Sequence, residues 1–382
     1  MPASGCKSGS SSTVNVPNKE GIFHLMVPKT QAAGPLVSVV TPFFNTAPYL
    51  AECIESVLAQ SYSRFEYILL DNCSTDGSTE IAARYASRDS RIRLIRCSEF
   101  LSQLANYNRA LGEISEASTY CKIVQADDWI FPECLESMVQ AFEQSESIGL
   151  VSSYWLDGNQ LCGSGLSPRT TMLPGKECAR WYLRTGTCLF ATQTQVMYRS
   201  SLVRSDKAFY NVSFPSFADL QKHMEMLERW DFGFVHKVLS FSRRDNDSIL
   251  SSFQSFAPGE LLQYIFARRY AHDLLEKGEA ASITAKYKRE YNRALARAVL
   301  GLRGRAFWRF HRATLKALDG REAFDWPYLA MMTGAELLWL ISNPGTTALR
   351  ALRSLKRRSR SQRKSRAARK QIGFSKIAPL TK

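Results

Sequence analysis

The chain has 382 residues, of which 45% are hydrophobic and 22% are charged, as in an ordinary globular protein. Its formal net charge is +15, but thirteen Lys or Arg and no acidic residue lie between Arg350 and the C-terminus, so the rest of the chain carries only +2. This placement argues against a nucleic-acid-binding body. The nine cysteines form no CxxC pair, and no secretory-type apolar leader is found, so we expect a cytoplasmic protein. No apolar run reaches eighteen residues, so we expect no spanning helix.

Composition divides the chain into four parts. Residues 1–34 are rich in Ser, Gly and Pro and are predicted to form a disordered leader. Residues 35–256 alternate short apolar runs with amphipathic segments, so we expect one α/β domain there. Residues 257–345 are rich in Ala, Leu, Arg and Tyr and predict a helical accessory region, and residues 346–382 are expected to form a basic tail.

Within the α/β part, β-branched or apolar runs predict strands at residues 37–41, 67–70, 92–95, 121–125 and 149–153. Amphipathic segments between them predict helices, including one from 101 to 114 and one from 132 to 143. This alternation is typical of a mostly parallel sheet with helices on both faces. Ligands of such sheets bind beyond the carboxyl ends of the strands.

Two adjacent carboxylates, Asp127 and Asp128, follow the fourth apolar run. Carboxylates at the end of a buried strand are costly unless a cation neutralises them, and Mg²⁺ or Mn²⁺ prefers such oxygen ligands and can then bind a diphosphate. Alone, such a pair is more often a solvated turn. However, Thr41 and Asp71 are expected at the same edge of the sheet, so these residues together predict a metal-dependent nucleotide-diphosphate site.

The turn after the first strand reads Thr41-Pro42-Phe43-Phe44-Asn45 and contains no GxGxxG. The absence of these glycines argues against a dinucleotide-dependent hydride-transfer enzyme. An aromatic ring and an Asn can instead hold a base by stacking and polar contact, although the two Phe alone would more often belong to the core.

Four segments, taken in order, resemble family 2 glycosyltransferases: residues 41–45, 56–62 and 71–78, and Ala126-Asp127-Asp128. The resemblance covers roughly residues 35–251. It implies a GT-A fold, a nucleotide-activated sugar donor, a divalent metal (Mn²⁺ or Mg²⁺) and inversion at the anomeric carbon. Processive members carry a Gln three residues before Arg-Trp, which Arg229-Trp230 lacks, so transfer of a single sugar is implied.

The resemblance also implies roles for residues near the nucleotide. Thr41 and Phe44 would border the base, with Asn45 as the polar member of the same turn, and Asp71 and Asn72 would contact uracil or ribose. Many members have Asp at the position of Asn72. Because an amide cannot act as a pure acceptor, this departure leaves the identity of the base open.

For the diphosphate and metal, the resemblance assigns four more residues. Asp128 would be the direct metal ligand, and Asp127 would contact the ribose or orient the metal site. Asn108 would lie near the nucleotide. Arg243 would serve the phosphates, with a surface loop as the alternative, and Asp245 stands where the family often has His.

Inverting transfer needs one base that takes the proton of the acceptor hydroxyl. Asp219 begins a predicted helix about ninety residues after the metal pair and resembles the family's base. A helix N-cap would suit Asp equally well. Asp206 and Asp231 are weaker candidates, and His223 is expected on the helix surface.

The resulting prediction is a transferase that moves one sugar from a nucleotide-diphosphate sugar, with a UDP-sugar favoured, to a hydroxyl of a glycan or lipid-linked acceptor in cell-surface polysaccharide or glycolipid synthesis. One alternative is a sugar-phosphate nucleotidyltransferase, which shares the sheet but opens with a Gly-rich, Arg-containing loop. Another is nucleic-acid binding through the basic tail, which the near-neutral body makes unexpected.

A membrane partner is also predicted from the C-terminal part. Residues 352–370 hold ten Lys or Arg, which attract anionic headgroups, and the apolar segment 326–341 before them could lie in the interface. We therefore expect peripheral contact with the inner face of the plasma membrane, with a solvated tail as the alternative.

Overall fold

The structure is a computed structural model that describes residues 34–190, 192–206, 208–212, 217–244, 256, 258–319 and 324–345. The predicted leader, the basic tail and Asp245 lie outside these ranges, apart from residue 34 at the end of the leader. The described strands are β1 Val37–Phe43, β2 Phe65–Asp71, β3 Ile92–Arg96, β4 Tyr120–Ile123, β5 Trp129–Ile130, β6 Ile148–Asp157, β7 Gln160–Cys162, β8 Met172–Leu173, β9 Met197–Arg199 and β10 Asp231–Ser242.

The helices of the α/β part are α1 Ala47–Leu58, α2 Ser78–Ala86, α3 Gln103–Leu111, α4 Cys134–Phe142, α5 Gly175–Thr185, α6 Ser200–Ser205 and α7 Ala218–Leu227, with a 3₁₀ turn, η1, at Gln193–Gln195. The C-terminal helices are α9 Pro258–Leu274, α10 Lys277–Leu300, α11 Arg305–Asp319 and α12 Trp326–Ser342.

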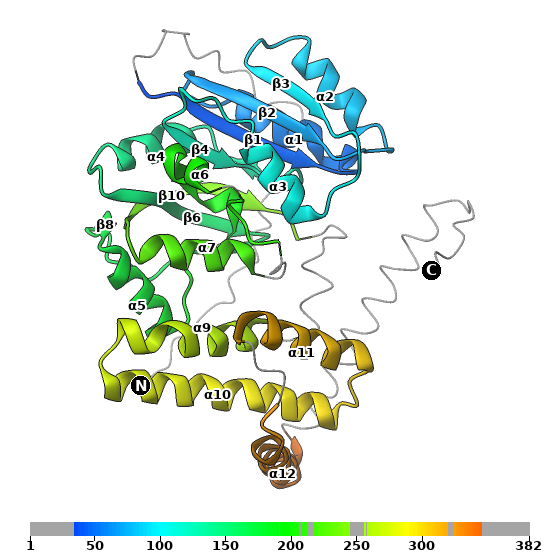
Figure 1. Cartoon of the computed structure of the whole chain (residues 1–382), viewed down its shortest axis with the longest axis vertical. Helices are drawn as coiled ribbons and strands as arrows, with labels where there is room; N and C mark the ends of the chain where they lie inside the picture. Colours follow the sequence, from blue (N-terminus) through cyan, green and yellow to red (C-terminus); the bar gives the residue numbers. More distant parts are fainter. Residues whose placement is uncertain are drawn as a thin grey trace, which may run out of the picture.

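The strands form one mixed sheet in the order β3-β2-β1-β4-β9-β6-β10-β5, with β7 paired to β6 and β8 paired to β10 (Figure 1). β3, β2, β1 and β4 are parallel to their neighbours in this group, and β6 and β10 form a second parallel pair. β9 is antiparallel to both β4 and β6 and joins the two groups. The predicted mostly parallel α/β sheet is therefore confirmed.

Alternate residues of the central strands pack on opposite faces of the sheet. Val37 and Val39 of β1 belong to the core formed with α1, α2 and α4, whereas Val40 belongs to the core formed with α3, α5 and α7. This second core continues into the C-terminal helices, because Leu261 of α9 and Tyr287 of α10 are part of the same buried cluster.

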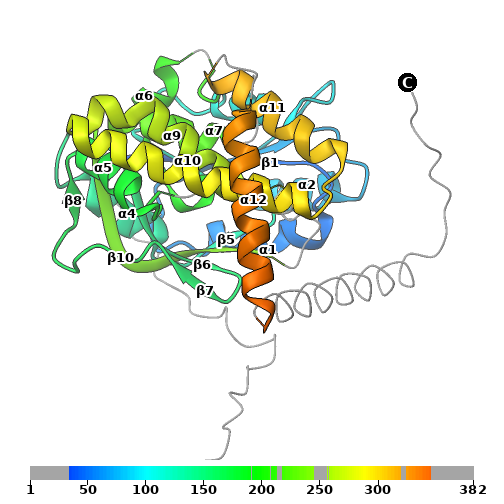
Figure 2. The same ribbon diagram turned by 90° about the horizontal axis from the view of Figure 1, so that it is seen from below.

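The C-terminal helices lie together on one side of the sheet, below it in Figure 1. α10 packs against α9, and α12 crosses α10, as Figure 2 shows. The predicted helical extension is confirmed by these elements. Among the described helices, none combines the length and the apolar character that crossing a bilayer requires.

β1 is longer than the sequence predicted, because it ends at Phe43 and not at Thr41. β1 pairs with β4 only through Val40, so the missing N–H of Pro42 breaks no hydrogen bond of that ladder. As a result Thr41 lies inside the sheet, and Phe44 is the first residue beyond the strand.

Candidate functional site

The turns that follow β1 and β2 are held together by side-chain hydrogen bonds. Asn45, whose backbone φ of +50° lies in the left-handed region, accepts the N–H of Thr75 at 2.8 Å. Asp76 accepts the N–H of Ala47 at 2.9 Å and the hydroxyl of Ser78 at 2.6 Å, at the first turns of α1 and α2. Burial raises the pKa of Asp76, but these hydrogen bonds outweigh it, so the pKa lies below its usual value.

Two residues predicted to contact the nucleotide are engaged inside the fold. Thr41 is fully buried, and its hydroxyl lies 3.0 Å from the hydroxyl of Tyr67, so its side chain does not reach the surface of the site. Asp71 is also buried and accepts the N–H of Ser74 at 2.9 Å and the hydroxyl of Thr79 at 2.5 Å. Its carboxylate therefore stabilises the turn after β2.

Asn72 holds the segment between β3 and α3. Its Nδ2 donates to the carbonyl of Leu101 at 2.9 Å, and its Oδ1 accepts the N–H of Leu101 at 2.8 Å. The adjacent Phe100 contacts Phe44 edge to face, with 4.9 Å between ring centroids. Because Phe44 is 42% exposed and Phe100 is 62% exposed, the two rings form an aromatic pair open to solvent. The sequence pointed to Phe44 but not to Phe100.

Asp128 is buried at the carboxyl end of β4 and receives three hydrogen bonds. Its Oδ2 accepts the hydroxyls of Thr194 at 2.8 Å and Ser242 at 3.2 Å, and its Oδ1 accepts the N–H of Arg243 at 3.0 Å. Burial, followed by the charge of Asp127, raises the pKa of Asp128 to about 7, although the three hydrogen bonds oppose this. A cation at this site would favour the charged form of both carboxylates.

Arg243 crosses the turn that carries the Asp pair. Its Nε donates to the carbonyl of Asp127 at 3.1 Å, and one of its terminal nitrogens lies 2.5 Å from the carboxylate of Glu52. The guanidinium also lies over the rings of Tyr49 and Trp129, at 4.8 and 5.1 Å from their centroids. The structure thus brings Arg243 next to Asp127 and Asp128.

A buried lysine binds the backbone of the η1 turn, which carries the Asp128 partner Thr194. Lys122 of β4 is fully buried and donates to the carbonyls of Thr194 at 2.7 Å and Val196 at 3.4 Å. Burial lowers the pKa of its amine. The hydroxyl of Thr194 also accepts the N–H of Gln125 at 3.1 Å, so the η1 turn is bonded to the residues before Asp128 as well as to Asp128 itself. No sequence pattern indicated these partners, because Thr194 lies 66 residues from Asp128.

Asp219 lies in the first turn of α7, is partly buried, and its Oδ1 accepts the N–H of Leu220 at 2.8 Å. Burial raises its pKa to about 6, although backbone hydrogen bonds oppose the shift.

The pKa of the Tyr107 hydroxyl in α3 is shifted by burial and by nearby charges. Burial raises the pKa of this hydroxyl, a hydrogen bond with Gln125 lowers it, and the charges of Asp127, Asp128 and Asp219 raise it again. The buried hydroxyl of Tyr107 therefore stays protonated near neutral pH.

Asn108 fixes a backbone segment and does not point into an open site. Its Nδ2 donates to the carbonyl of Tyr210 at 2.7 Å, and its Oδ1 accepts the N–H of Tyr210 at 2.8 Å. His223 was expected on the helix surface, and this expectation is wrong because the side chain is fully buried. Its ring bonds the hydroxyl of Tyr198 at 2.7 Å and the carbonyl of Phe190 at 2.8 Å, and burial lowers its pKa to about 3.

The other two base candidates are engaged elsewhere. Asp231 begins β10 at the edge of the sheet opposite to Asp128, and it accepts the hydroxyl of Ser147 at 2.6 Å and the N–H of Gly175 at 3.2 Å. Asp206 forms an ion pair with Lys222. Neither carboxylate is placed beside the Asp pair by the contacts of the described residues.

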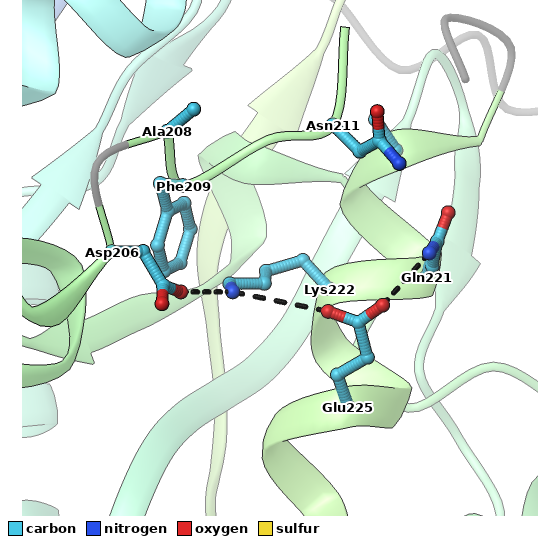
Figure 3. Close-up of a pocket in the computed structure, with 8 residues that line it drawn as sticks. Asp206, Ala208, Phe209, Asn211, Gln221, Lys222 and Glu225 are labelled. Carbon is cyan, nitrogen blue, oxygen red and sulfur yellow. Dashed lines mark hydrogen bonds and ion pairs between the residues drawn. The ribbon is translucent and has the colours of Figure 1, made fainter. Parts of the chain in front are cut away.

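A pocket of about 210 Å³ lies beside α7. Figure 3 shows the residues that line it. Lys222 lies between Asp206 and Glu225 and over the ring of Phe209, 4.9 Å from its centroid. The Nε2 of Gln221 donates to Glu225 at 2.7 Å, which leaves its buried Oε1 without a hydrogen-bond partner in the described part of the chain. The pocket is therefore polar, and most of its charged groups are already paired.

Sequence comparison decides the family. The profile of the family described as Glycosyl transferase family 2 matches residues 38–205. This match assigns residues 38–205 to family 2 glycosyltransferases. The predicted recognition is thereby confirmed, and the match includes Asp71, Asn108, Asp127 and Asp128, whereas Asp219 and Arg243 lie beyond its end.

Curated relatives of this region include two bacterial glycosyltransferases. The chain is 32% identical over 128 residues to Glycosyltransferase GlyG of Streptococcus pneumoniae serotype 4, covering 32% of this chain and 42% of GlyG. It is 34% identical over 106 residues to TuaG of Bacillus subtilis strain 168, provisionally named a teichuronic acid biosynthesis glycosyltransferase, covering 28% of this chain and 41% of TuaG. The matched segment thus spans less than half the length of these relatives.

Solved structures show the same fold. The crystal structure of S. aureus TarS 1–349 in complex with UDP superposes with a TM-score of 0.52 at 16% sequence identity, over 74% of this chain and 81% of that chain. At this identity the likeness supports the GT-A-type fold alone.

Proposed function

We propose that the protein is an inverting glycosyltransferase that moves one sugar from a nucleotide-diphosphate sugar to a hydroxyl of a glycan or lipid-linked acceptor. The observation that carries this proposal is the buried Asp128 beside Asp127 and Arg243 at the carboxyl end of β4, with Asp219 in the first turn of α7 as the candidate base. Inverting transfer needs a leaving-group site and a base on opposite sides of the reacting carbon, and these carboxylates supply candidates for both.

The leaving diphosphate would bind between the Asp pair and Arg243. Asp127 and Asp128 fit a Mn²⁺ or Mg²⁺ ion, because burial and mutual repulsion raise the pKa of Asp128 to about 7 and a cation would remove that repulsion. Among the described residues, no group of three His, Cys, Asp or Glu could hold a metal alone. This suits an ion that completes its coordination with phosphate oxygens and water, and that would neutralise charge on the leaving diphosphate when bound.

On the chain's own side, Arg243 is held in place for phosphate binding by the carbonyl of Asp127 and the carboxylate of Glu52. Its guanidinium can donate to a phosphate oxygen while these contacts fix its direction. The exposed rings of Phe44, which follows β1, and Phe100, which lies between β3 and α3, offer apolar faces to a base. We assign the nucleoside to this aromatic pair, with Asn72 and Asp71 supporting the turns beneath it.

Asp219 would take the proton of the acceptor hydroxyl as its oxygen attacks the anomeric carbon. A pKa of about 6 leaves its carboxylate mostly charged near neutral pH, while keeping it a stronger base than an exposed Asp. The proton ends on Asp219, the new glycosidic bond forms, and the bond to the diphosphate breaks.

The names of relatives support a UDP-sugar donor and a cell-surface product. TarS 1–349 was crystallised with UDP and with UDP-GlcNAc, and TuaG is named for teichuronic acid synthesis. The cysteines of the described ranges are free thiols, which suits a reducing compartment and a reaction on the cytoplasmic side of the membrane. The family match favours this function over a nucleotidyltransferase, and the tail on which nucleic-acid binding would depend lies outside the described residues.

The test uses the full-length chain with UDP, GDP and dTDP and with UDP-sugars, in Mn²⁺ or in EDTA. We compare wild type with Asp128→Asn, Asp219→Asn and the control Asp231→Asn, which changes a carboxylate at the opposite edge of the sheet. We expect metal-dependent release of UDP, loss of nucleotide binding in Asp128→Asn, and in Asp219→Asn normal donor binding with transfer reduced by about 10²-fold or more. Full turnover of Asp219→Asn, or no nucleotide binding by wild type, would overturn the proposal.

A further inference from the structure

α12 has an apolar outer surface and a charged inner contact, the reverse of an ordinary surface helix. Its side chains exposed to solvent include five large apolar ones, Trp326, Met331, Leu337, Leu338 and Ile341, and we call these the α12 outer face. Leu338 and Ile341 are 66% and 67% exposed. A contiguous apolar surface of this kind on a folded protein marks an interaction site.

The single charged residue of α12 points the other way. Glu336 is buried and accepts from Arg297 of α10 at 2.7 Å. At the other end of the helix, Asp325 caps the first turn by accepting the N–H of Tyr328 at 3.2 Å and pairs with Lys288 of α10 at 2.7 Å. Two ion pairs therefore fix the rotation of α12 against α10, and this rotation keeps the outer face turned away from the protein.

The segment before α12 and the chain that follows it are strongly basic in sequence. Residues 277–319, which include α10 and α11, contain eleven Lys or Arg against three Asp or Glu. Because Asp325 and Glu336 neutralise Lys288 and Arg297, an excess of six positive charges remains. The chain that follows α12 adds thirteen Lys or Arg and no acidic residue from Arg350 onward. An apolar helix beside positive charge matches the two components of an anionic bilayer surface, the acyl chains and the headgroups.

The length of α12 suits a position in the plane of the interface. Its seventeen residues extend about 25 Å, which is shorter than a bilayer-spanning helix needs. Figure 2 shows it lying across α10 on the outside of the helical extension. The helix can therefore enter the headgroup region along its length while α10 and α11 remain in water above it.

We propose that the α12 outer face inserts into the interface of an anionic lipid bilayer and that the basic residues of α10 and α11 hold the protein there. A second copy of this chain fits the face less well, because two such surfaces would bring their excesses of positive charge together. This inference does not depend on the proposed transferase activity, since it rests on the exposure and charge of the helical extension alone.

Vesicle binding by the full-length chain tests the proposal. Wild type is compared with Leu338→Glu/Ile341→Glu, and with the control Leu161→Glu/Met172→Glu, which adds the same charge at exposed apolar positions of β7 and β8. We expect wild type to float with vesicles of phosphatidylcholine containing about 30% phosphatidylglycerol, to bind pure phosphatidylcholine weakly, and to detach at high salt. The α12 variant should bind at least about tenfold more weakly, and the control should bind like wild type.

Three outcomes would overturn the proposal. Wild type could fail to bind anionic vesicles, or the α12 variant could bind them as well as wild type, which would leave binding to the basic tail alone. The third is a dimer of wild type, measured by light scattering, that the α12 variant converts to a monomer while vesicle binding stays unchanged. That result would assign the face to self-association. Circular dichroism and thermal unfolding of each variant check that the fold is intact.

Discussion

Asn72 and Leu101 exchange two hydrogen bonds, with the side-chain amide of Asn72 donating to the carbonyl at 2.9 Å and accepting the N–H at 2.8 Å. This pairing uses both halves of the amide and fixes the segment that presents Phe100 to Phe44. The residue therefore has a structural reason to be Asn, whichever base the protein binds. A carboxylate in its place would retain the acceptor and lose the donor.

Asn72→Asp is therefore expected to destabilise the protein by about 1–3 kcal/mol, because it leaves the carbonyl of Leu101 facing a buried negative charge. Nucleotide binding should weaken as well, since the segment that carries Phe100 loses a support. Urea unfolding and calorimetric titration with UDP measure the two effects. Asn108→Asp, which breaks the equivalent pairing with Tyr210, is the matched comparison for stability. Unchanged stability in Asn72→Asp would show that the pairing contributes little.

The hydroxyl of Thr194 is expected to control the charge of Asp128. Thr194→Val removes the 2.8 Å hydrogen bond to the carboxylate while keeping the shape of the side chain, so the pKa of Asp128 should rise further above 7. Binding of Mn²⁺ with UDP should weaken by about 1.5–3 kcal/mol near neutral pH and recover partly at higher pH. Calorimetry across this pH range measures the shift. Thr194→Ser, which keeps the hydroxyl, should behave like wild type, and equal loss in both variants would contradict the role of the hydroxyl.

The pH dependence of transfer should follow the ionisation of Asp219. A base must be deprotonated to accept a proton, so the transfer rate at saturating donor should rise as the pH increases through about 6 and level off above it. In Asp219→Asn this rise should disappear along with most of the activity. The rate is measured as UDP release between pH 5 and pH 8. A wild-type profile that is flat through this range would assign the proton to another group.

Buried His223 should make folding stability sensitive to acid. Burial lowers its pKa to about 3, while the unfolded chain binds a proton near pH 6.5, so between these values the unfolded state holds more protons. The contribution of buried, neutral His223 to the free energy of unfolding should be complete above pH 6.5. As the pH decreases from 6.5 toward 3, the free energy of unfolding should fall by up to about 1.4 kcal/mol per pH unit. Urea unfolding at several pH values measures this slope.

Other groups also titrate in that range, so the comparison between variants isolates His223. His223→Gln should be less stable than wild type at pH 7.5 and should show a shallower loss toward acid. His272→Gln changes an exposed histidine of α9 and serves as the control. Parallel acid slopes for wild type and His223→Gln would exclude a contribution from this histidine.

The sequence predicted the sheet because strand runs and helix stripes are local signals, and it predicted the Asp127-Asp128 turn because the pair directly follows a buried run. It did not predict the partners of Asp128, because Thr194 and Ser242 lie 66 and 114 residues away in the sequence and reach Asp128 only in the folded chain. Thr41 was placed at the site because the predicted strand ended two residues too early. His223 was misplaced because a histidine beside an apolar stripe gives no signal of its buried partners.

The end of the family match is not an end in the packing of the molecule. A chain cut after residue 205 would retain every matched position, yet Asp128 would lose two of its three donors, which come from β10 and the residue after it. The cut would also expose apolar side chains of α3 and α5, because residues of α7 and α9 belong to the same buried cluster. A chimera that exchanges residues 38–205 between relatives must therefore exchange α7, β10 and α9 together with them.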